Sequence, residues 1–346
     1  MRCCVSCALG ACLAASAAAQ TDAPLKLRIV GGLAGVNQYV NHEQPFWARE
    51  LPRLSGGRIT AEIVPFDQAG IRSQEMLRVM QLGTVPFGTA LLSRIQTVDA
   101  ELSTADLAGL NPDMASLRRH MGAFRPHLER IMRERHGIEV LAVYVYPAQV
   151  TFCTRPFNGL SDLAGRRVRT GSPSQADLMR ALGAIPVQTE FAEIVSAVKS
   201  GVVECAVTGA MSGNTIGLHE VTHHLDPKAV SWGLSIFGAN LGAWNALPAH
   251  ARNLMRDELP KLEQAIWAES DRDTSEGVAC NTGGACTSGR KGRMTEVKAS
   301  AADAQRVRQI FTGTVLPAWL RRCGPACVAL WNQSMAPVVG LEARPQ

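Results

Sequence analysis

Three features are scarce in this 346-residue chain: aromatic side chains, clustered charge and long apolar runs. Aromatic residues make up only 5% of the sequence, so stacking platforms for nucleic-acid bases are few. The net charge of +5 is spread without a long basic run, which argues against nucleic acid as the main partner. No phosphate loop, dinucleotide-binding fingerprint or G-x-S-x-G elbow occurs. We therefore expect no catalytic residue, no cofactor and no metal.

The overall proportions of hydrophobic and charged residues are typical of an exported globular protein. Hydrophobic residues make up 46% and charged residues 19%, which allows a sizeable core, and the length indicates two lobes. Residues 1–19 carry one charge, at Arg2, then an apolar run that ends in an A-x-A cleavage pattern at 17–19. We interpret them as an export signal. After them, no stretch reaches the roughly 20 continuous apolar residues of a membrane helix.

The export signal predicts a periplasmic protein. Release in soluble form is favoured over a lipid anchor at Cys12, because Cys12 would fall very early for a lipoprotein signal. The run LGAC, which ends at Cys12, resembles a lipoprotein cleavage box. A lipid anchor at Cys12 is therefore the alternative.

Six of the ten cysteines follow the predicted signal. An even number in an exported protein indicates disulfides, because its compartment is oxidising. A metal cluster is the alternative, but the close C-x-x-C spacing of zinc sites is missing. The predicted pairs are Cys280 with Cys286, Cys323 with Cys327, and Cys153 with Cys205.

The chain is organised around residues 163–209, where strand and helix patterns alternate. The expected elements are strand 166–170, helix 173–182, strand 185–189, helix 193–200 and strand 202–207. Ser172 suits the helix N-cap, Pro173 the first helical position, and Gln175 completes a capping box. This alternation within so few residues predicts a parallel sheet.

Arg169 ends the first of these strands, beside the expected helix N-terminus. Small ligands bind open parallel sheets beyond the carboxyl ends of the strands. An arginine there presents a planar, permanently charged fork to a carboxylate, and the helix N-terminus adds favourable potential for an anion. The alternative is a solvated basic run, since Arg166 and Arg167 are adjacent. Alternation places Arg167 on the face of Arg169 and Arg166 on the other.

Several motifs of this chain carry a family resemblance. They are the runs DLAGRRVR, ALGAIPV and FAEIVSAVKSGVVECA and, earlier, GGRITAEIVPFDQAGIRSQEMLRVMQLGTVPFG. Together they resemble the solute-binding proteins of tripartite ATP-independent periplasmic (TRAP) transporters, over most of residues 25–275. The resemblance implies an α/β fold with two lobes around a central cleft and a long helix spanning both. It also implies capture of a small organic acid, delivery to membrane subunits, and Arg169 as the residue that grips the carboxylate.

The sequence departs from the family pattern at two positions near this site. Many relatives carry a glutamine-glutamate-asparagine-proline run, and its asparagine helps to hold the carboxylate. Here residues 206–209 read Ala-Val-Thr-Gly, so that Thr208 offers one hydrogen bond in its place. Gln149 stands about where some relatives have a second arginine. Fewer charges imply a monocarboxylate or a less acidic ligand.

The two lobes are expected to exchange segments of chain. Lobe I comprises residues 23–146 with about 232–250. Lobe II comprises 147–231 with about 251–346, and this last range includes the spanning and C-terminal helices. The chain crosses near Tyr146 and returns through a strand at about 231–243. Apolar residues at helical spacing predict a helix over 248–277, which Pro260 should kink or split.

The remaining candidates for ligand contact come from the expected cleft walls. A strand at 25–30 and a helix at about 43–54 leave Asn37, Gln38 and Tyr39 in a loop that faces the cleft; simple loop polarity is the alternative. Tyr146 and Trp232 are candidate cleft walls, with ordinary hinge packing as the alternative. Asn214 and Trp244 are weaker candidates. Ser73 is expected to cap a helix that ends near Leu82.

The run from His219 to His223 matches H-E-x-x-H, which on a helix would place two zinc ligands on one face with Glu220 as general base. A zinc-dependent hydrolase is therefore the alternative function. Val221 and Thr222 are weak helix formers, glycines precede the motif and Pro227 follows it, so a chance match is favoured.

Overall fold

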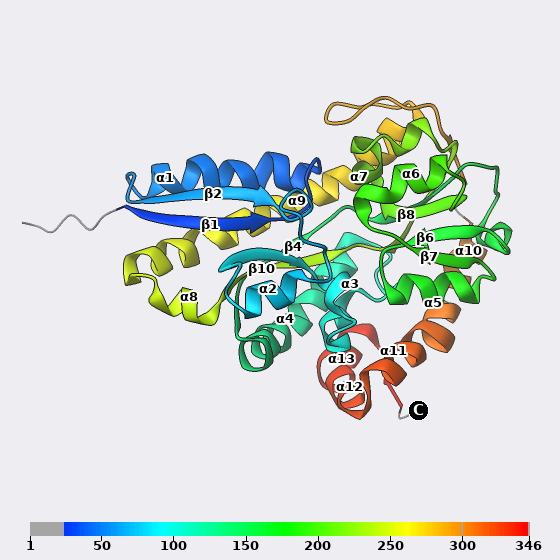
Figure 1. Ribbon diagram of the computed structural model, residues 1–346. Helices are drawn as coiled ribbons and strands as arrows, with labels where there is room; N and C mark the ends of the chain where they lie inside the picture. The colour runs from blue at the N-terminus through cyan, green and yellow to red at the C-terminus, as the bar shows by residue number, and fades with distance from the viewer. Residues whose placement is uncertain (1–23, 299, 345–346) are drawn as a thin grey trace, which may run out of the picture.

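The computed structural model describes residues 24–298 and 300–344 of the chain. The predicted export signal and Cys12 lie outside these residues. Two β-sheets with their flanking helices form two lobes side by side, and one long helix passes from one lobe to the other (Figure 1). This is the two-lobed α/β architecture that the sequence predicts. In the part of the chain described, no helix combines the length and apolarity needed to cross a membrane.

The first sheet is built mostly from the N-terminal part of the chain. In spatial order its strands are β2 (Ile59–Pro65), β1 (Leu25–Gly31), β3 (Phe87–Leu91), β10 (Leu234–Asn240) and β4 (Ile138–Val145). β1 pairs in parallel with β2 and β3, whereas β10 runs antiparallel to β3 and β4. The chain therefore returns to this sheet, as the strand pattern at 231–243 predicts.

The second sheet contains the predicted parallel unit. In spatial order its strands are β11 (Thr295–Glu296), β9 (His224–Ser231), β5 (Gln149–Cys153), β8 (Cys205–Gly209), β6 (Arg167–Thr170) and β7 (Ile185–Gln188). β6 pairs in parallel with β7 and β8, which confirms that prediction. β5 runs antiparallel to β8 and β9, so the sheet is mixed.

The α-helices cover both sheets and form the C-terminal part of the chain. Their bounds are α1 (Leu51–Leu54), α2 (Met76–Gln81), α3 (Leu92–Ile95), α4 (Met114–His136), α5 (Pro173–Ala181), α6 (Ile194–Lys199), α7 (Ala210–Thr215), α8 (Leu241–Ala246), α9 (Ala249–Thr282), α10 (Ala301–Ile310), α11 (Leu316–Cys323), α12 (Pro325–Leu330) and α13 (Ala336–Val339). Helices α11 to α13 lie below both sheets at the C-terminal end (Figure 1).

The N-terminus of α5 confirms the predicted cap. The Ser172 hydroxyl accepts a hydrogen bond from the Gln175 backbone N–H at 3.1 Å, and Pro173 occupies the first turn. The second half of the motif differs from a capping box, because the Gln175 side chain accepts from the N–H of Gly171 at 2.7 Å. Both bonds fix the turn between Arg169 and the helix.

The helix after β1 begins earlier than predicted. It starts at Gln38 with the π-helical turns Gln38–Glu43 and Phe46–Glu50 and continues into α1. The prediction of a loop there was therefore wrong. The reason is tertiary packing, which overrides weak local preference: this segment lies against α9, and its buried polar side chains find partners there.

The spanning helix α9 is continuous over 34 residues, about 51 Å at 1.5 Å per residue. Of the kink or split predicted at Pro260, the split does not occur. Buried side chains on both sides of that proline, Met255, Leu259 and Leu262, pack into the core of the first lobe and hold the helix together. Near its other end, Gly277 lets the backbone of α9 touch that of α7, since a Cβ there would lie 2.3 Å from the Met211 nitrogen.

All three predicted disulfides are present. Cys153 and Cys205 face each other directly across β5 and β8, with their Cα atoms 4.1 Å apart. The other pairs are local closures, Cys280 with Cys286 at the end of α9 and Cys323 with Cys327 between α11 and α12. The cross-strand bond ties two neighbouring strands of the second sheet.

We expect a protein produced as residues 20–346 and folded in an oxidising compartment to contain no free thiol. Thiol titration under denaturing, non-reducing conditions is the measurement, with the reduced protein as the control. Reactive thiols in the unreduced sample at the level of the reduced one would contradict the three pairings.

Candidate ligand-binding site

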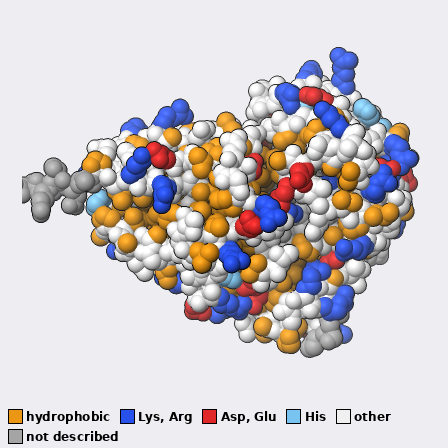
Figure 2. All heavy atoms as spheres, in the orientation of Figure 1, with side chains coloured by type: hydrophobic (Ala, Val, Ile, Leu, Met, Phe, Trp, Pro, Cys, Tyr) orange, Lys and Arg blue, Asp and Glu red, His pale blue; other side chains and the backbone are white. Residues whose placement is uncertain are grey.

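A cavity of about 70 Å³ lies between the two lobes. This volume holds only a few water-sized groups, so it fits a small polar molecule. Charged side chains of both signs gather along the boundary between the lobes in the view of Figure 2. The charged side chains that line the cavity are Arg94, Asp106, Arg169 and Glu190.

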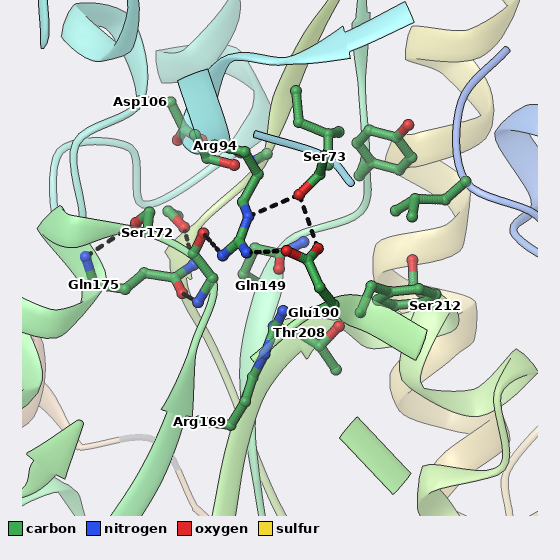
Figure 3. A pocket seen from close by; sticks show the side chains of 18 residues that line it. Ser73, Arg94, Asp106, Gln149, Arg169, Ser172, Gln175, Glu190, Thr208 and Ser212 are labelled. Atoms are coloured by element: carbon green, nitrogen blue, oxygen red, sulfur yellow. Dashed lines mark hydrogen bonds and ion pairs between the residues drawn. The ribbon is translucent and has the colours of Figure 1, made fainter. Parts of the chain in front are cut away.

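Arg169 is the penultimate residue of β6 and is 5% exposed. Its Nη1 donates to the carbonyl of Val207 at 2.8 Å and its Nη2 to that of Thr189 at 3.1 Å. Its buried Nε has no partner in the part of the chain described, and no carboxylate there pairs with it. The side chain points into the cavity beside Glu190 and Thr208 (Figure 3). A buried arginine that forms no ion pair with any carboxylate of the described residues is the strongest feature of this site.

The electrostatic environment of Arg169 reflects that isolation. Burial, with a smaller contribution from the neighbouring Arg94, lowers the pKa of Arg169 to about 9. Its guanidinium is still protonated at neutral pH. A bound anion would supply the missing charge and the missing hydrogen-bond acceptor together.

Two other predicted residues line the same cavity near Arg169. Gln149 begins β5 and Thr208 lies near the end of β8, and both contribute to the lining. Gly171 and Ser172, at the N-terminus of α5, complete this wall. The positive end of the α5 dipole therefore lies beside the guanidinium, which favours an anion at this position.

An ion pair that the sequence did not indicate joins the two walls of the cavity. Arg94 in α3 binds Glu190, which follows β7, with Nη2 and Oε1 2.6 Å apart. The Ser73 hydroxyl accepts from Arg94 Nε at 3.0 Å and donates to Glu190 Oε2 at 2.8 Å. Figure 3 shows the three side chains converging across the cavity. The lobes are thus joined across the cleft by charge-assisted bonds.

Ser73 therefore does not cap a helix, contrary to the sequence prediction. α2 begins only at Met76, and no side chain caps it. The hydroxyl is instead buried and bonded to both members of the ion pair. A serine before a helical pattern is typical of a cap, so nothing local distinguished the two roles.

Asp106 lines the cavity near the two segments in which the chain crosses between the lobes, at Tyr146 and at Trp232 and Gly233. Its carboxylate accepts from the backbone N–H of Gly233 at 2.7 Å and from that of Trp232 at 3.0 Å. Burial raises the pKa of Asp106 to about 6 despite these bonds. The Tyr146 backbone N–H donates to the Gly233 carbonyl at 3.0 Å, so the two crossing segments lie side by side.

Asn37 and Gln38 lie outside this cavity. The amide of Asn37 donates to Asp273 at 2.9 Å, and that of Gln38 donates to Ser270 and Asp273 at 3.0 and 3.1 Å. These contacts join the helix after β1 to α9. Tyr39 is also buried outside the cavity, against Gly31 at the end of β1.

Of the predicted aromatic walls, the structure brings only Tyr146 to the cavity. The Trp232 indole donates to the carbonyl of Asn111 at 3.1 Å, within the hinge packing. Asn214 binds Asn281 and the backbone of Arg290. Trp244 is buried beneath Arg256, whose guanidinium carbon lies 5.3 Å from the centre of its ring.

The H-E-x-x-H match does not form a zinc site. His219 and Glu220 lie in a single 3-10 turn, Leu218–Glu220, and His223 follows after that turn has ended. The two histidines therefore share no helix face. The Glu220 carboxylate is paired with Arg290 at 2.9 Å. No group of three metal-binding side chains occurs in residues 24–298 and 300–344, and the hydrolase hypothesis is withdrawn.

Two α/β lobes with a small cleft between them, lined by an arginine that has no carboxylate partner among the described residues, are typical of a two-lobed solute-binding protein. Residues 33–280 match the family model described as Bacterial extracellular solute-binding protein, family 7. The chain belongs to this family, which is the TRAP solute-binding family that its motifs resemble. Its members are binding receptors and not enzymes.

Individual relatives agree with the family assignment. Solute-binding protein RD1_1052 of Roseobacter denitrificans is 27% identical over 207 residues, 56% of this chain and 59% of that protein. The chain thus spans about three fifths of the length of this curated relative.

Two solved structures share the fold. DctP7 of Bordetella pertussis, an extracytoplasmic solute receptor binding pyroglutamic acid, has a TM-score of 0.75 at 19% identity, with 90% of this chain and 99% of that chain covered. A TRAP periplasmic solute-binding protein of Desulfovibrio salexigens with bound orotic acid has a TM-score of 0.79 at 17% identity, with the same shares covered.

Proposed function

We propose that this protein captures a small organic carboxylate in the cleft between its lobes and delivers it to the membrane subunits of a TRAP transporter. The observation that carries the proposal is Arg169, a buried arginine that faces the cavity and has no carboxylate partner among the described residues. Burying an unpaired charge is costly, and a ligand carboxylate relieves that cost. Solved proteins of this fold hold pyroglutamic acid, orotic acid and succinate.

The roles of the surrounding residues follow from their positions. Arg169 anchors the carboxylate, and Thr208 and Gln149 offer hydrogen bonds beside it. Tyr146 contributes an apolar ring to the cleft wall. Closure of the lobes then excludes water, which strengthens each of these polar contacts.

The proposed division into lobes is the one predicted from the sequence, 23–146 with about 232–250 and 147–231 with about 251–346, where the last range includes the spanning and C-terminal helices. The first half of the spanning helix α9 packs into the core of the first lobe. We place the protein in the periplasm because the family is extracellular and residues 1–19 read as an export signal.

The test is a screen of organic acids by thermal shift with the purified protein, followed by calorimetry on the hits. Ligand at 100 times its Kd stabilises a protein by roughly 2.7 kcal/mol, which is readily detected as a higher melting temperature. We expect small carboxylates to raise it and their neutral amides or esters to have little effect. Stabilisation by neutral compounds alone would contradict the proposal.

A further inference from the structure

Two arginines line the cleft, Arg94 and Arg169, and within residues 24–298 and 300–344 only Arg94 forms an ion pair with a carboxylate. Each nitrogen of the Arg94 guanidinium has an acceptor: Ser73 at 3.0 Å, the Gly171 carbonyl at 3.3 Å and Glu190 at 2.6 Å. The pair is largely withdrawn from water, with the Arg94 side chain 9% and that of Glu190 29% exposed. Arg94 is therefore neutralised from within the protein.

Glu190 is held in this position from both sides. Its two carboxylate oxygens bind Arg94 and Ser73. It also forms a capping box with Glu193 at the 3-10 turn Phe191–Glu193 that leads into α6. To bind Arg94, a ligand carboxylate would have to displace a carboxylate that is already fixed there.

We propose that Glu190 makes this cleft selective for ligands with a single carboxylate, because its ion pair with Arg94 leaves that arginine unavailable to a second ligand carboxylate. A monoanion pairs with Arg169 and leaves the Arg94–Glu190 pair intact. The second carboxylate of a dianion would lie near Glu190, where two like charges in a poorly hydrated site repel each other. This inference rests on the proposed function, because it assumes that the ligand is a carboxylate bound at Arg169.

The test compares pairs of ligands that differ in one charged group. Succinate and glutarate are each measured against their monoamides, succinamate and glutaramate, by calorimetry at neutral pH. The wild-type protein should bind each monoamide at least about tenfold more tightly than its dicarboxylate. In Glu190→Gln the side chain keeps its shape but loses its charge. The ratio of the affinity for each monoamide to that for its dicarboxylate should therefore fall at least about tenfold.

Two further variants separate this role from a structural one. Glu75→Gln removes an exposed carboxylate that pairs with Arg72, outside the cavity lining, and should leave the ratio unchanged. The double variant Arg94→Gln with Glu190→Gln removes both charges, so the preference for monoamides should return. This return also guards against the possibility that Glu190→Gln acts only by loosening the fold.

Three results would overturn the inference: wild-type protein that binds each dicarboxylate as tightly as its monoamide, a Glu190→Gln ratio within threefold of wild type, or a double variant that behaves as the single one. If organic acids bind but the ratio does not respond, the role of Glu190 fails and the proposed function stands. If no carboxylate binds any of these proteins, the proposed function itself fails.

Discussion

Replacing Arg169 with alanine is expected to reduce affinity for the ligand by about 2–5 kcal/mol, because the ligand carboxylate is then buried without its partner. Arg169→Lys should also bind poorly. Lysine keeps the charge but loses the planar fork that bonds a carboxylate through two parallel N–H groups. Calorimetry with the best ligand from the organic-acid screen measures both effects.

Arg166→Ala is the matched control for this loss. Arg166 lies three residues away, and its guanidinium donates to the backbone carbonyls of Arg155 and Pro156, outside the cavity. The Arg166→Ala variant should bind the ligand almost as tightly as the wild-type protein. Melting temperatures of all three variants report folding, which matters because Arg169 also bonds Val207 and Thr189. A folded Arg169→Ala that binds within about threefold of wild type, under 1 kcal/mol, would place the anchor elsewhere.

The second large effect is expected at Gly277, where α9 meets α7. A Cβ there would lie 2.3 Å from the backbone nitrogen of Met211 and 2.6 Å from the carbonyl carbon of Ala210. Backbone cannot move aside as a flexible side chain can, so Gly277→Ala must force the two helices apart. We expect the free energy of unfolding to fall by about 3 kcal/mol or more, measured by urea denaturation.

Gly122→Ala makes the same chemical change without the clash. Gly122 lies within α4, and a Cβ there meets nothing within 4 Å. Alanine is the better helix former, so this variant should be more stable by about 0.5–1 kcal/mol. If Gly277→Ala were as stable as Gly122→Ala, the close approach of α7 and α9 would be contradicted.

The sequence predicts best where local signals and topology agree. The parallel unit β6–α5–β7–α6–β8 and the Ser172 cap follow from periodicity and capping chemistry, and they place Arg169 at a strand end. The disulfide between Cys153 and Cys205 also fits this register, because the two residues are direct partners across neighbouring strands.

Local sequence signals do not predict the other half of the cavity. Arg94 and Glu190 are 96 residues apart, and Ser73 is 117 residues from Glu190, so their meeting depends on how the lobes close. At Asn37 and Gln38 the opposite occurred: the sequence predicted ligand contacts, but the structure has buried packing contacts. Their amides look like ligand contacts in a loop, but a helix carries them into α9, where Asp273 and Ser270 accept their hydrogen bonds.

The two carbonyls that hold Arg169 have a thermodynamic consequence. An exposed arginine side chain carries about 2 kcal/mol of rotamer entropy. Here Val207 and Thr189 fix the fork before any ligand arrives, so this disorder is lost during folding rather than during binding. A carboxylate thus meets a rigid receptor at this point, and the entropic cost of its capture falls mainly on the ligand and on the relative motion of the lobes.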